Sequence, residues 1–257
     1  MPDAKDYMKS LERLLENPPE RRPDEVTFWS IGGIPAVNTA DHNEYVFFWE
    51  QLGMEGLSCF RVDGHGDFMD YIRPRDGVAP YYVMLDINEQ YAAGVHYGHL
   101  RPPIFWLNPF SEERRLQMLD KKTRLDQIGP SERIVWDASP SELRSIRDSK
   151  CTVIGPEDVQ IQHPFLLDID LDGLSSVLVH NVPCGYDGTR GYDARIQYTM
   201  DVVRGLDRPD AIFITRSHPA KGDEKYVPSE FVADVETKTL DGLGRLYGAV
   251  MKLGQWD

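Results

Sequence analysis

Hydrophobic residues recur at helical spacing near the amino terminus of the chain, and a turn-forming stretch follows them. The spacing predicts an amphipathic helix over residues 4–16. The sequence NPPERRPDE at 17–25 then breaks the pattern with prolines and charged residues. The apolar face of the helix consists of Tyr7, Met8, Leu11, Leu14 and Leu15.

Short apolar runs further along the chain predict strands, and helical stretches separate many of them. Strands are expected over 26–33, 57–67 (running into a polar loop), 103–108, 133–138, 151–155 at a sheet edge, 163–174 and 211–217. Helices are expected over 41–53, 84–94, 139–146, 193–207 and 228–247, and the charged stretch 111–129 is either a solvated helix or an insertion. This alternation predicts an α/β fold of three layers, α/β/α, with a mostly parallel central sheet. We expect a single domain over residues 1–257, in which 1–22 form an N-terminal helix and linker.

Acidic residues and histidines gather where three of the predicted strands end. Ligand sites in parallel sheets lie beyond the carboxyl ends of the strands, so these groups are expected to converge. They are Asp41 and His42 after the first strand, Asp63, His65 and Asp67 after the second, and Asp168, Asp170 and Asp172 within 163–174.

Converging carboxylates need a counter-charge, because burying several of them without one costs many kcal/mol or forces them to take up protons. Oxygen-rich ligands with some imidazole and no thiolate suit Mn²⁺, with Fe²⁺, Co²⁺ and Zn²⁺ as alternatives. A structural calcium site is disfavoured by His42 and His65, since Ca²⁺ prefers oxygen ligands. Two ions that share bridging carboxylates can activate a water molecule for hydrolysis.

Composition narrows the class of protein and of partner. The chain has 257 residues, 41% of them hydrophobic, and no apolar stretch approaches the roughly 18 residues of a membrane span. Its three scattered cysteines and the lack of a secretory signal pattern indicate a reducing, cytoplasmic location. The net charge of −14 disfavours nucleic acid and anionic membrane as partners and suits a metal cation or a basic substrate. The sequence leaves a homo-oligomer open.

In order and strand-end context, the three acidic groups resemble the signatures of the arginase/deacetylase (ureohydrolase) superfamily. The runs 41–52, 166–174 and 208–217 are most similar to a divergent branch that includes peptide arginases. The resemblance spans residues 26–220, although Thr39 and Ala40 stand where the family has two glycines. It implies an arginase-like fold with two Mn²⁺ ions. The implied substrate is an arginine-containing, ribosomally made precursor peptide, and the products are ornithine and urea.

The resemblance also implies roles for individual residues. One ion would bind His42, Asp63, Asp67 and Asp168, and the other would bind Asp63, His65, Asp168 and Asp170, with Asp63 and Asp168 bridging. Asp172 would support the ligands without binding. The implied catalytic residues are Asp67 and a proton-shuttle histidine, for which His96 is the first candidate and His99 the second, against a structural role for each. The candidates for binding the substrate are Asp223, Glu224 and Glu236 for the guanidinium and Arg216 for a carboxylate or a ligand, against ordinary surface or salt-bridge roles.

Three alternatives to a peptide arginase remain open. Another amidino-hydrolase or a metal-dependent deacetylase of the same fold would use related ligands. A non-catalytic module would hold metal or peptide without turnover. No residues that grip the α-amino and α-carboxylate groups of free arginine are evident, which favours a peptide substrate. The helix at 4–16 is then a candidate for docking a leader segment of that peptide.

Overall fold

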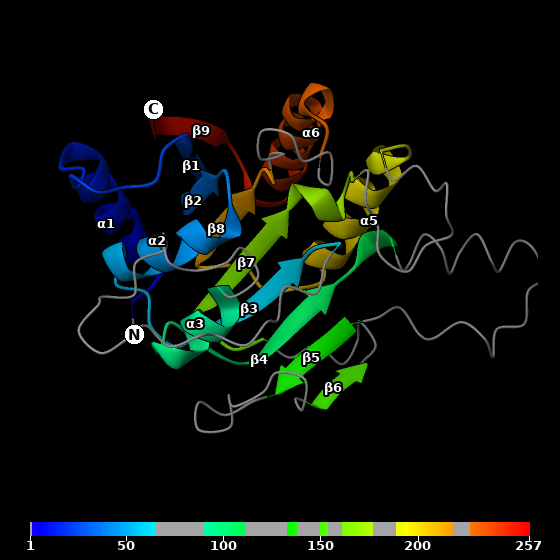
Figure 1. Cartoon of the computed structure of the whole chain (residues 1–257), viewed down its shortest axis with the longest axis horizontal. Helices are drawn as coiled ribbons and strands as arrows, with labels where there is room; N and C mark the ends of the chain where they lie inside the picture. Colours follow the sequence, from blue (N-terminus) through cyan, green and yellow to red (C-terminus); the bar gives the residue numbers. More distant parts are fainter. Residues whose placement is uncertain are drawn as a thin grey trace, which may run out of the picture.

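The computed structural model describes residues 2–64, 90–110, 133–137, 150–153, 161–176, 189–217 and 227–257. The described strands form one nine-stranded sheet that includes segments from both ends of the chain (Figure 1). The strand order is β6 (Lys150–Val153), β5 (Arg133–Asp137), β4 (Leu100–Leu107), β3 (Leu57–Val62), β7 (Phe165–Asp170), β8 (Ala211–Thr215), β2 (Ile34–Thr39), β1 (Val26–Ile31) and β9 (Val250–Trp256).

The centre of the sheet is parallel and both flanks are antiparallel. Strands β4, β3, β7, β8 and β2 run in the same direction. On one flank β5 and β6 alternate in direction, and on the other β1 and β9 do the same. The prediction of an α/β fold with a mostly parallel central sheet is therefore confirmed, with β6 at an edge as expected from 151–155.

Two features of the sheet differ from the sequence-based expectation. The predicted strand 26–33 is the first arm of a hairpin, in which Gly32 and Gly33 form the turn with φ of 59° and 88°. Two adjacent residues with positive φ suit the tight turns of hairpins. The chain then returns as β2, which was not predicted. Strand β9 was also not predicted. Most of its residues are only half-buried or exposed, so its sequence has no continuous apolar run that would indicate a strand.

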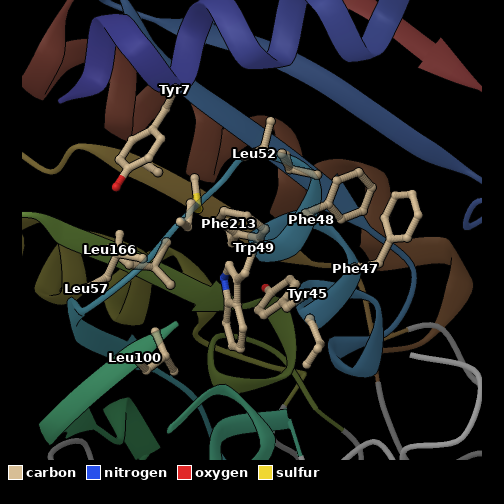
Figure 2. Close-up of a cluster of buried hydrophobic side chains, with 14 of the residues drawn as sticks. Tyr7, Tyr45, Phe47, Phe48, Trp49, Leu52, Leu57, Leu100, Leu166 and Phe213 are labelled. Atoms are coloured by element: carbon tan, nitrogen blue, oxygen red, sulfur yellow. The ribbon is translucent and has the colours of Figure 1, made fainter. Parts of the chain in front are cut away.

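Helices cover both faces of the sheet. Helices α1 (Ala4–Glu16), α2 (Tyr45–Gln51) and α3 (Gln90–His96) contribute to one buried cluster, shown in part in Figure 2. Helices α5 (Tyr192–Arg204) and α6 (Ser229–Tyr247) contribute to the cluster on the opposite face. The architecture is thus α/β/α, as predicted. Of the helical predictions, 139–146 and 111–129 lie outside the described residues.

Individual helices form where the periodicity placed them. Helix α1 spans the predicted 4–16 and begins at Asp3, whose side chain accepts hydrogen bonds from the amides of Lys5 and Asp6. Helices α5 and α6 match 193–207 and 228–247 within a few residues. The 41–53 prediction becomes a short 3₁₀ turn, η1 (His42–Glu44), that continues into α2. None of the helices in the described ranges is long and apolar enough to cross a bilayer.

Candidate metal centre

Strands β3 and β7 present their carboxylates on the sheet face that α2 and α3 cover. Side chains alternate between the two faces of a strand. Cys59 of β3 and Leu166 of β7 belong to the buried cluster of that face. Asp63, four residues after Cys59, and Asp168 and Asp170, two and four residues after Leu166, therefore lie on the same face. All three are at most 2% exposed.

His42 reaches these carboxylates from beyond the carboxyl end of β2, which β8 separates from β7. It starts the turn η1, directly after the chain leaves the sheet, and is 4% exposed. Its Nε2 lies 3.1 Å from Oδ2 of Asp170. One potential ligand atom from each of His42, Asp63 and Asp170 lies within 4.8 Å of the other two. Three residues predicted from separate sequence motifs are thus brought together at the carboxyl edge of the parallel strands.

Asp170 is held by neutral donors and lies beside a second acid. The Ser217 hydroxyl lies 2.7 and 2.9 Å from its two carboxylate oxygens, and the Asp172 amide donates to Oδ1 at 2.9 Å. Burial, followed by the charge of Asp172, raises the pKa of Asp170 to about 8, and His42 opposes this rise. Burial and the neighbouring acid therefore disfavour the ionised form of Asp170, and a bound cation would favour it.

Asp63 pairs with a buried arginine. Arg61 is fully buried, and its guanidinium forms an ion pair with the Asp63 carboxylate. The guanidinium also lies over the ring of Tyr91 at 4.5 Å and farther from that of Trp106 at 5.9 Å. Trp106 in turn donates from Nε1 to the backbone oxygen of Asp63 at 2.9 Å. Asp63 is therefore held by its side chain and by its backbone.

Asp168 has a different environment from Asp170. The hydroxyl of Tyr45 donates to Oδ1 of Asp168 at 2.9 Å, and the hydroxyl of Tyr91 donates to Oδ2. Thr215 donates a further hydrogen bond to the Tyr45 hydroxyl. Burial, followed by the charge of Asp168, raises the pKa of Tyr45 well above its usual value, so the phenol stays protonated and keeps donating. We refer to Tyr45 and Tyr91 below as the tyrosine clamp.

Of the two histidines predicted as proton shuttles, His99 lies away from the cluster. Nδ1 of His99 lies 2.7 Å from the backbone oxygen of Met54, and its own backbone oxygen pairs with Leu57 at the start of β3. Asp63 follows the other end of that strand, about 20 Å away at roughly 3.3 Å per residue. His96 ends α3 beside Tyr97, with ring centroids 4.9 Å apart. The structure therefore places His99 away from the cluster and His96 at the end of α3.

Arg216 lies at the carboxyl end of β8 but already has internal partners. Its Nε donates to Oδ1 of Asn38 at 3.2 Å, and an Nη donates to the backbone oxygen of Glu25. The Asn38 amide donates to Glu236 at 2.6 Å. Arg216 and Glu236, two of the proposed substrate-binding residues, are therefore part of a hydrogen-bonded network that joins α6 to the sheet. The predicted residues His65, Asp67, Asp223 and Glu224 lie outside the described residues.

Arg61, Tyr45 and Tyr91 were not predicted from the sequence as part of the site. Tyr45 lies one helical turn after His42, and this spacing is a usable signal, because residues three apart share a helix face. Arg61 is on β3 and Asp63 directly follows that strand, two positions later, which places both side chains on one face. Tyr91 is 77 positions from its partner Asp168 in sequence, and no motif marks it.

The donor set fits a divalent metal ion. Asp63, Asp168, Asp170 and Asp172 are all buried on or beside this edge, where Arg61 pairs with Asp63 and the buried Arg195 donates to the backbone oxygen of Leu174. An excess of buried negative charge is stable when a cation neutralises it. Carboxylates combined with one imidazole suit first-row divalent metals such as Mn²⁺, Fe²⁺ or Zn²⁺. The group formed by His42, Asp63 and Asp170 can therefore hold a metal ion.

No protein-family model and no curated protein matches this chain. The resemblance to the ureohydrolases accordingly rests on the three motifs themselves, and the following proposal rests on those motifs and on the cluster.

Proposed function

We propose that this protein is a metal-dependent hydrolase that cleaves the guanidino group of arginine residues in a peptide, giving ornithine and urea. The observation that carries the proposal is the buried cluster of His42, Asp63 and Asp170 at the carboxyl edge of the parallel strands. Its members come from the three motifs that resemble those of the ureohydrolases, in the same order along the chain. A buried group of one imidazole and two carboxylates is the kind of ligand set that such hydrolases need to bind their metal ions.

The cofactor in this proposal is a pair of Mn²⁺ ions. His42, Asp63 and Asp170 would hold one ion, and His65 and Asp67, which follow Asp63 in the sequence, would help to hold the pair. When bound, such ions acidify a coordinated water and stabilise the negative charge that develops during hydrolysis.

The surrounding residues of the chain fix the ligands in place. Ser217 and the Asp172 amide set the orientation of the Asp170 carboxylate, and Arg61 does the same for Asp63. Residues that orient ligands in this way often change metal affinity 10- to 100-fold when they are replaced. The site is thus preorganised by hydrogen bonds before a cation enters.

Two observations favour a peptide over free arginine. Arg216, the candidate partner for a substrate carboxylate, already donates to Asn38 and Glu25. A residue within a peptide has no free carboxylate to bind at that position. The net charge of −14 also favours the approach of a basic, arginine-containing segment.

The test is incubation of the Mn²⁺-loaded protein with arginine-containing peptides and, separately, with free arginine. We expect mass spectrometry to show ornithine in the peptide and a colorimetric assay to show urea. Asp170→Asn should abolish both, whereas Asp201→Asn, which alters an exposed acid on α5, should leave both unchanged. Peptides carrying acetyl-lysine, and small guanidines, separate the deacetylase and other amidino-hydrolase alternatives. Protein that binds Mn²⁺ but turns over none of these substrates would contradict a hydrolytic function.

A further inference from the structure

Gln90, at the start of the described part of α3, has a buried side-chain amide without hydrogen-bond partners. The residue is fully buried, and neither Oε1 nor Nε2 has a hydrogen-bond partner in the part of the chain that the structure describes. Among the described buried side chains, only Gln90 leaves two polar atoms unpaired in this way. We infer that Gln90 binds the reacting guanidino group of the substrate. The inference rests on the proposed function and adds to it a residue that contacts this group.

The topology of the sheet places Gln90 near the carboxyl edge of the parallel strands. Helix α3 connects β3 with β4, which run in the same direction, so the helix runs from the carboxyl edge of the sheet back to the amino edge. Gln90 directly precedes Tyr91, whose hydroxyl donates to Asp168 of β7. Helical side chains tilt towards the N-terminus of their helix. The amide of Gln90 is therefore directed to the edge at which the metal-binding cluster lies.

The face of α3 that carries Gln90 packs against α2, which runs in the same direction from β2 to β3. A Cβ atom added to Gly94 would lie 2.5 Å from Cζ3 of Trp49. Residues four apart share a helix face, so Gln90 lies one turn nearer the carboxyl edge than Gly94. On α2, Tyr45 lies one turn nearer that edge than Trp49 (Figure 2), and its ring centroid is 5.4 Å from that of His42. Gln90 therefore lies at the His42 end of the seam between the two helices.

A structural role does not account for the Gln90 amide. Burying an amide that makes no hydrogen bond destabilises a fold, whereas a methionine of similar length would fill the same space without that penalty. The tyrosine clamp does not supply the missing partners, because both phenols donate to Asp168 and the Tyr45 hydroxyl also accepts from Thr215. The amide of Gln90 therefore fits a residue whose partner is a ligand of the site.

The two polar atoms of the amide suit the hydrolysis of a guanidino group. Oε1 accepts a hydrogen bond from a guanidinium N–H, and Nε2 donates to the water-derived oxygen that the guanidino carbon gains and that urea retains. A guanidinium has donors only, so the substrate pairs with Oε1 alone, whereas the oxygenated product pairs with both atoms. Gln90 therefore binds the group more strongly once the oxygen has been added. Binding that strengthens along the reaction accelerates the chemical step.

The test compares Gln90→Met with a matched control, Gln197→Met, which changes an exposed glutamine on α5. Urea release from a short arginine-containing peptide gives kcat and KM for each Mn²⁺-loaded protein, calorimetry gives the Mn²⁺ affinity and thermal unfolding gives the Tm. We expect Gln90→Met to lower kcat about 100-fold and to change KM and Mn²⁺ affinity less than about tenfold. Its Tm should equal or exceed that of the wild type, because an unpaired buried amide has been removed. Gln197→Met should match the wild type in all four measurements.

Three results for Gln90→Met overturn the inference: a wild-type kcat, a loss confined to KM, or a Tm below that of the wild type. If Gln90→Met does not fold, Gln90→Ala, which is too small to clash, decides by the same kcat criterion. Failure of both variants to fold would assign Gln90 to the core and overturn the inference as well. Wild-type protein that releases no urea overturns the proposed function and this inference with it, whereas turnover that Gln90→Met retains overturns this inference alone.

Discussion

The hydroxyl of Ser217 lies 2.7 and 2.9 Å from the two carboxylate oxygens of Asp170. Ser217 reaches this position with a φ of 47°, in the left-handed region that residues other than glycine seldom adopt. Its amide donates to the backbone oxygen of Ala40 at 3.1 Å, in the segment that leads to His42. Ser217 thus connects the end of β8 to two of the proposed metal ligands.

Replacing Ser217 by alanine should weaken metal binding. The variant removes the hydroxyl donor from Asp170 and keeps the unfavourable φ, so we expect a stability loss of about 1–3 kcal/mol and a 10- to 100-fold loss of Mn²⁺ affinity. Ser217→Gly is the matched control, because it removes the same hydroxyl and tolerates the positive φ. Mn²⁺ affinity should fall equally in both variants, whereas urea denaturation should show higher stability for glycine. Unchanged Mn²⁺ affinity in Ser217→Ala would mean that the hydroxyl does not orient the ligand.

A buried carboxyl on the turn after His42 predicts a pH dependence of stability. Burial, followed by the charge of Asp41, raises the pKa of Glu44 to about 8 from its ordinary 4.5. Between these values the folded metal-free protein binds a proton at Glu44 that the unfolded chain does not bind. The contribution of Glu44 to the free energy of unfolding is therefore fully present below the pKa that Glu44 has in the unfolded chain. This contribution is lost as the pH rises through the pKa that Glu44 has in the folded protein.

Glu44→Gln should flatten this dependence, because glutamine stays neutral and keeps an oxygen to accept from the Ala40 amide. The loss of stability in the wild type between pH 5 and pH 8 is expected to be on the order of a few kcal/mol, measured by urea denaturation of the metal-free protein. The raised pKa of Asp170 adds a dependence of the same sign, which should remain in the variant. Glu50→Gln on the exposed side of α2 is the control and should behave like the wild type. If the free energy of unfolding of Glu44→Gln fell as steeply with pH as that of the wild type, Glu44 would not be a cause of the pH dependence.

Sequence periodicity was sufficient for most of the fold, because long helices and buried strands have clear hydrophobic patterns. It missed β2 and β9 for physical reasons. The residue pair Gly32-Gly33 forms a hairpin turn, but apolar residues on both sides of it made 26–33 resemble one strand that ends in a loop. Strand β9 lies at the edge of the sheet and few of its side chains are buried. Its hydrophobic pattern is therefore too weak to predict a strand from the sequence.

The convergence of His42, Asp63 and Asp170 followed from one rule, since the carboxyl ends of all parallel strands lie at one edge of a sheet. The choice among Asp168, Asp170 and Asp172 did not follow, because alternate positions on one strand look equivalent in sequence. Only the packing of α2 and α3 distinguishes them, by placing two phenols against Asp168. Such contacts join segments far apart in the chain and leave no local signal.

Gly173 is the second place where the backbone controls the site. A Cβ atom there would lie 2.7 Å from Cα of Asp63 and 2.9 Å from the amide nitrogen of Gly64, and backbone atoms cannot yield as a flexible side chain can. Gly173→Ala should therefore separate the ends of β3 and β7, with a loss of about 1–3 kcal/mol in stability. Because Asp63 and Asp170 sit on those two ends, calorimetry should also show weaker Mn²⁺ binding.

The matched control is Gly205→Ala at the end of α5, where the added Cβ atom meets the Val202 oxygen at 3.3 Å and φ is −77°. That variant should bind Mn²⁺ like the wild type. A Gly173→Ala protein that retains wild-type stability and Mn²⁺ affinity would show that the contact between the two strand ends is not essential.

Helix α1 was proposed from the sequence as a docking element for a peptide leader, and the structure shows that its inner face is part of the core. Tyr7 and Leu11 are 1% and 0% exposed and belong to the cluster that also contains Phe48 and Trp49. Deleting residues 1–20 would therefore unfold this layer and could not report on peptide binding alone. Leu11→Ala is expected to cost about 2–5 kcal/mol in the free energy of unfolding.

The exposed face of the helix, which carries Lys9, Glu12 and Arg13, provides a cleaner experiment. Reversing the charges of all three should change the free energy of unfolding by less than about 1 kcal/mol, because exposed ion pairs contribute little. If α1 docks the leader, the same variant should raise the KM for a full-length precursor peptide and leave the KM for a short arginine peptide unchanged. An equal KM for the full-length peptide in wild type and variant would place leader recognition elsewhere. In that case, the stability loss in Leu11→Ala would still identify α1 as a structural part of the fold.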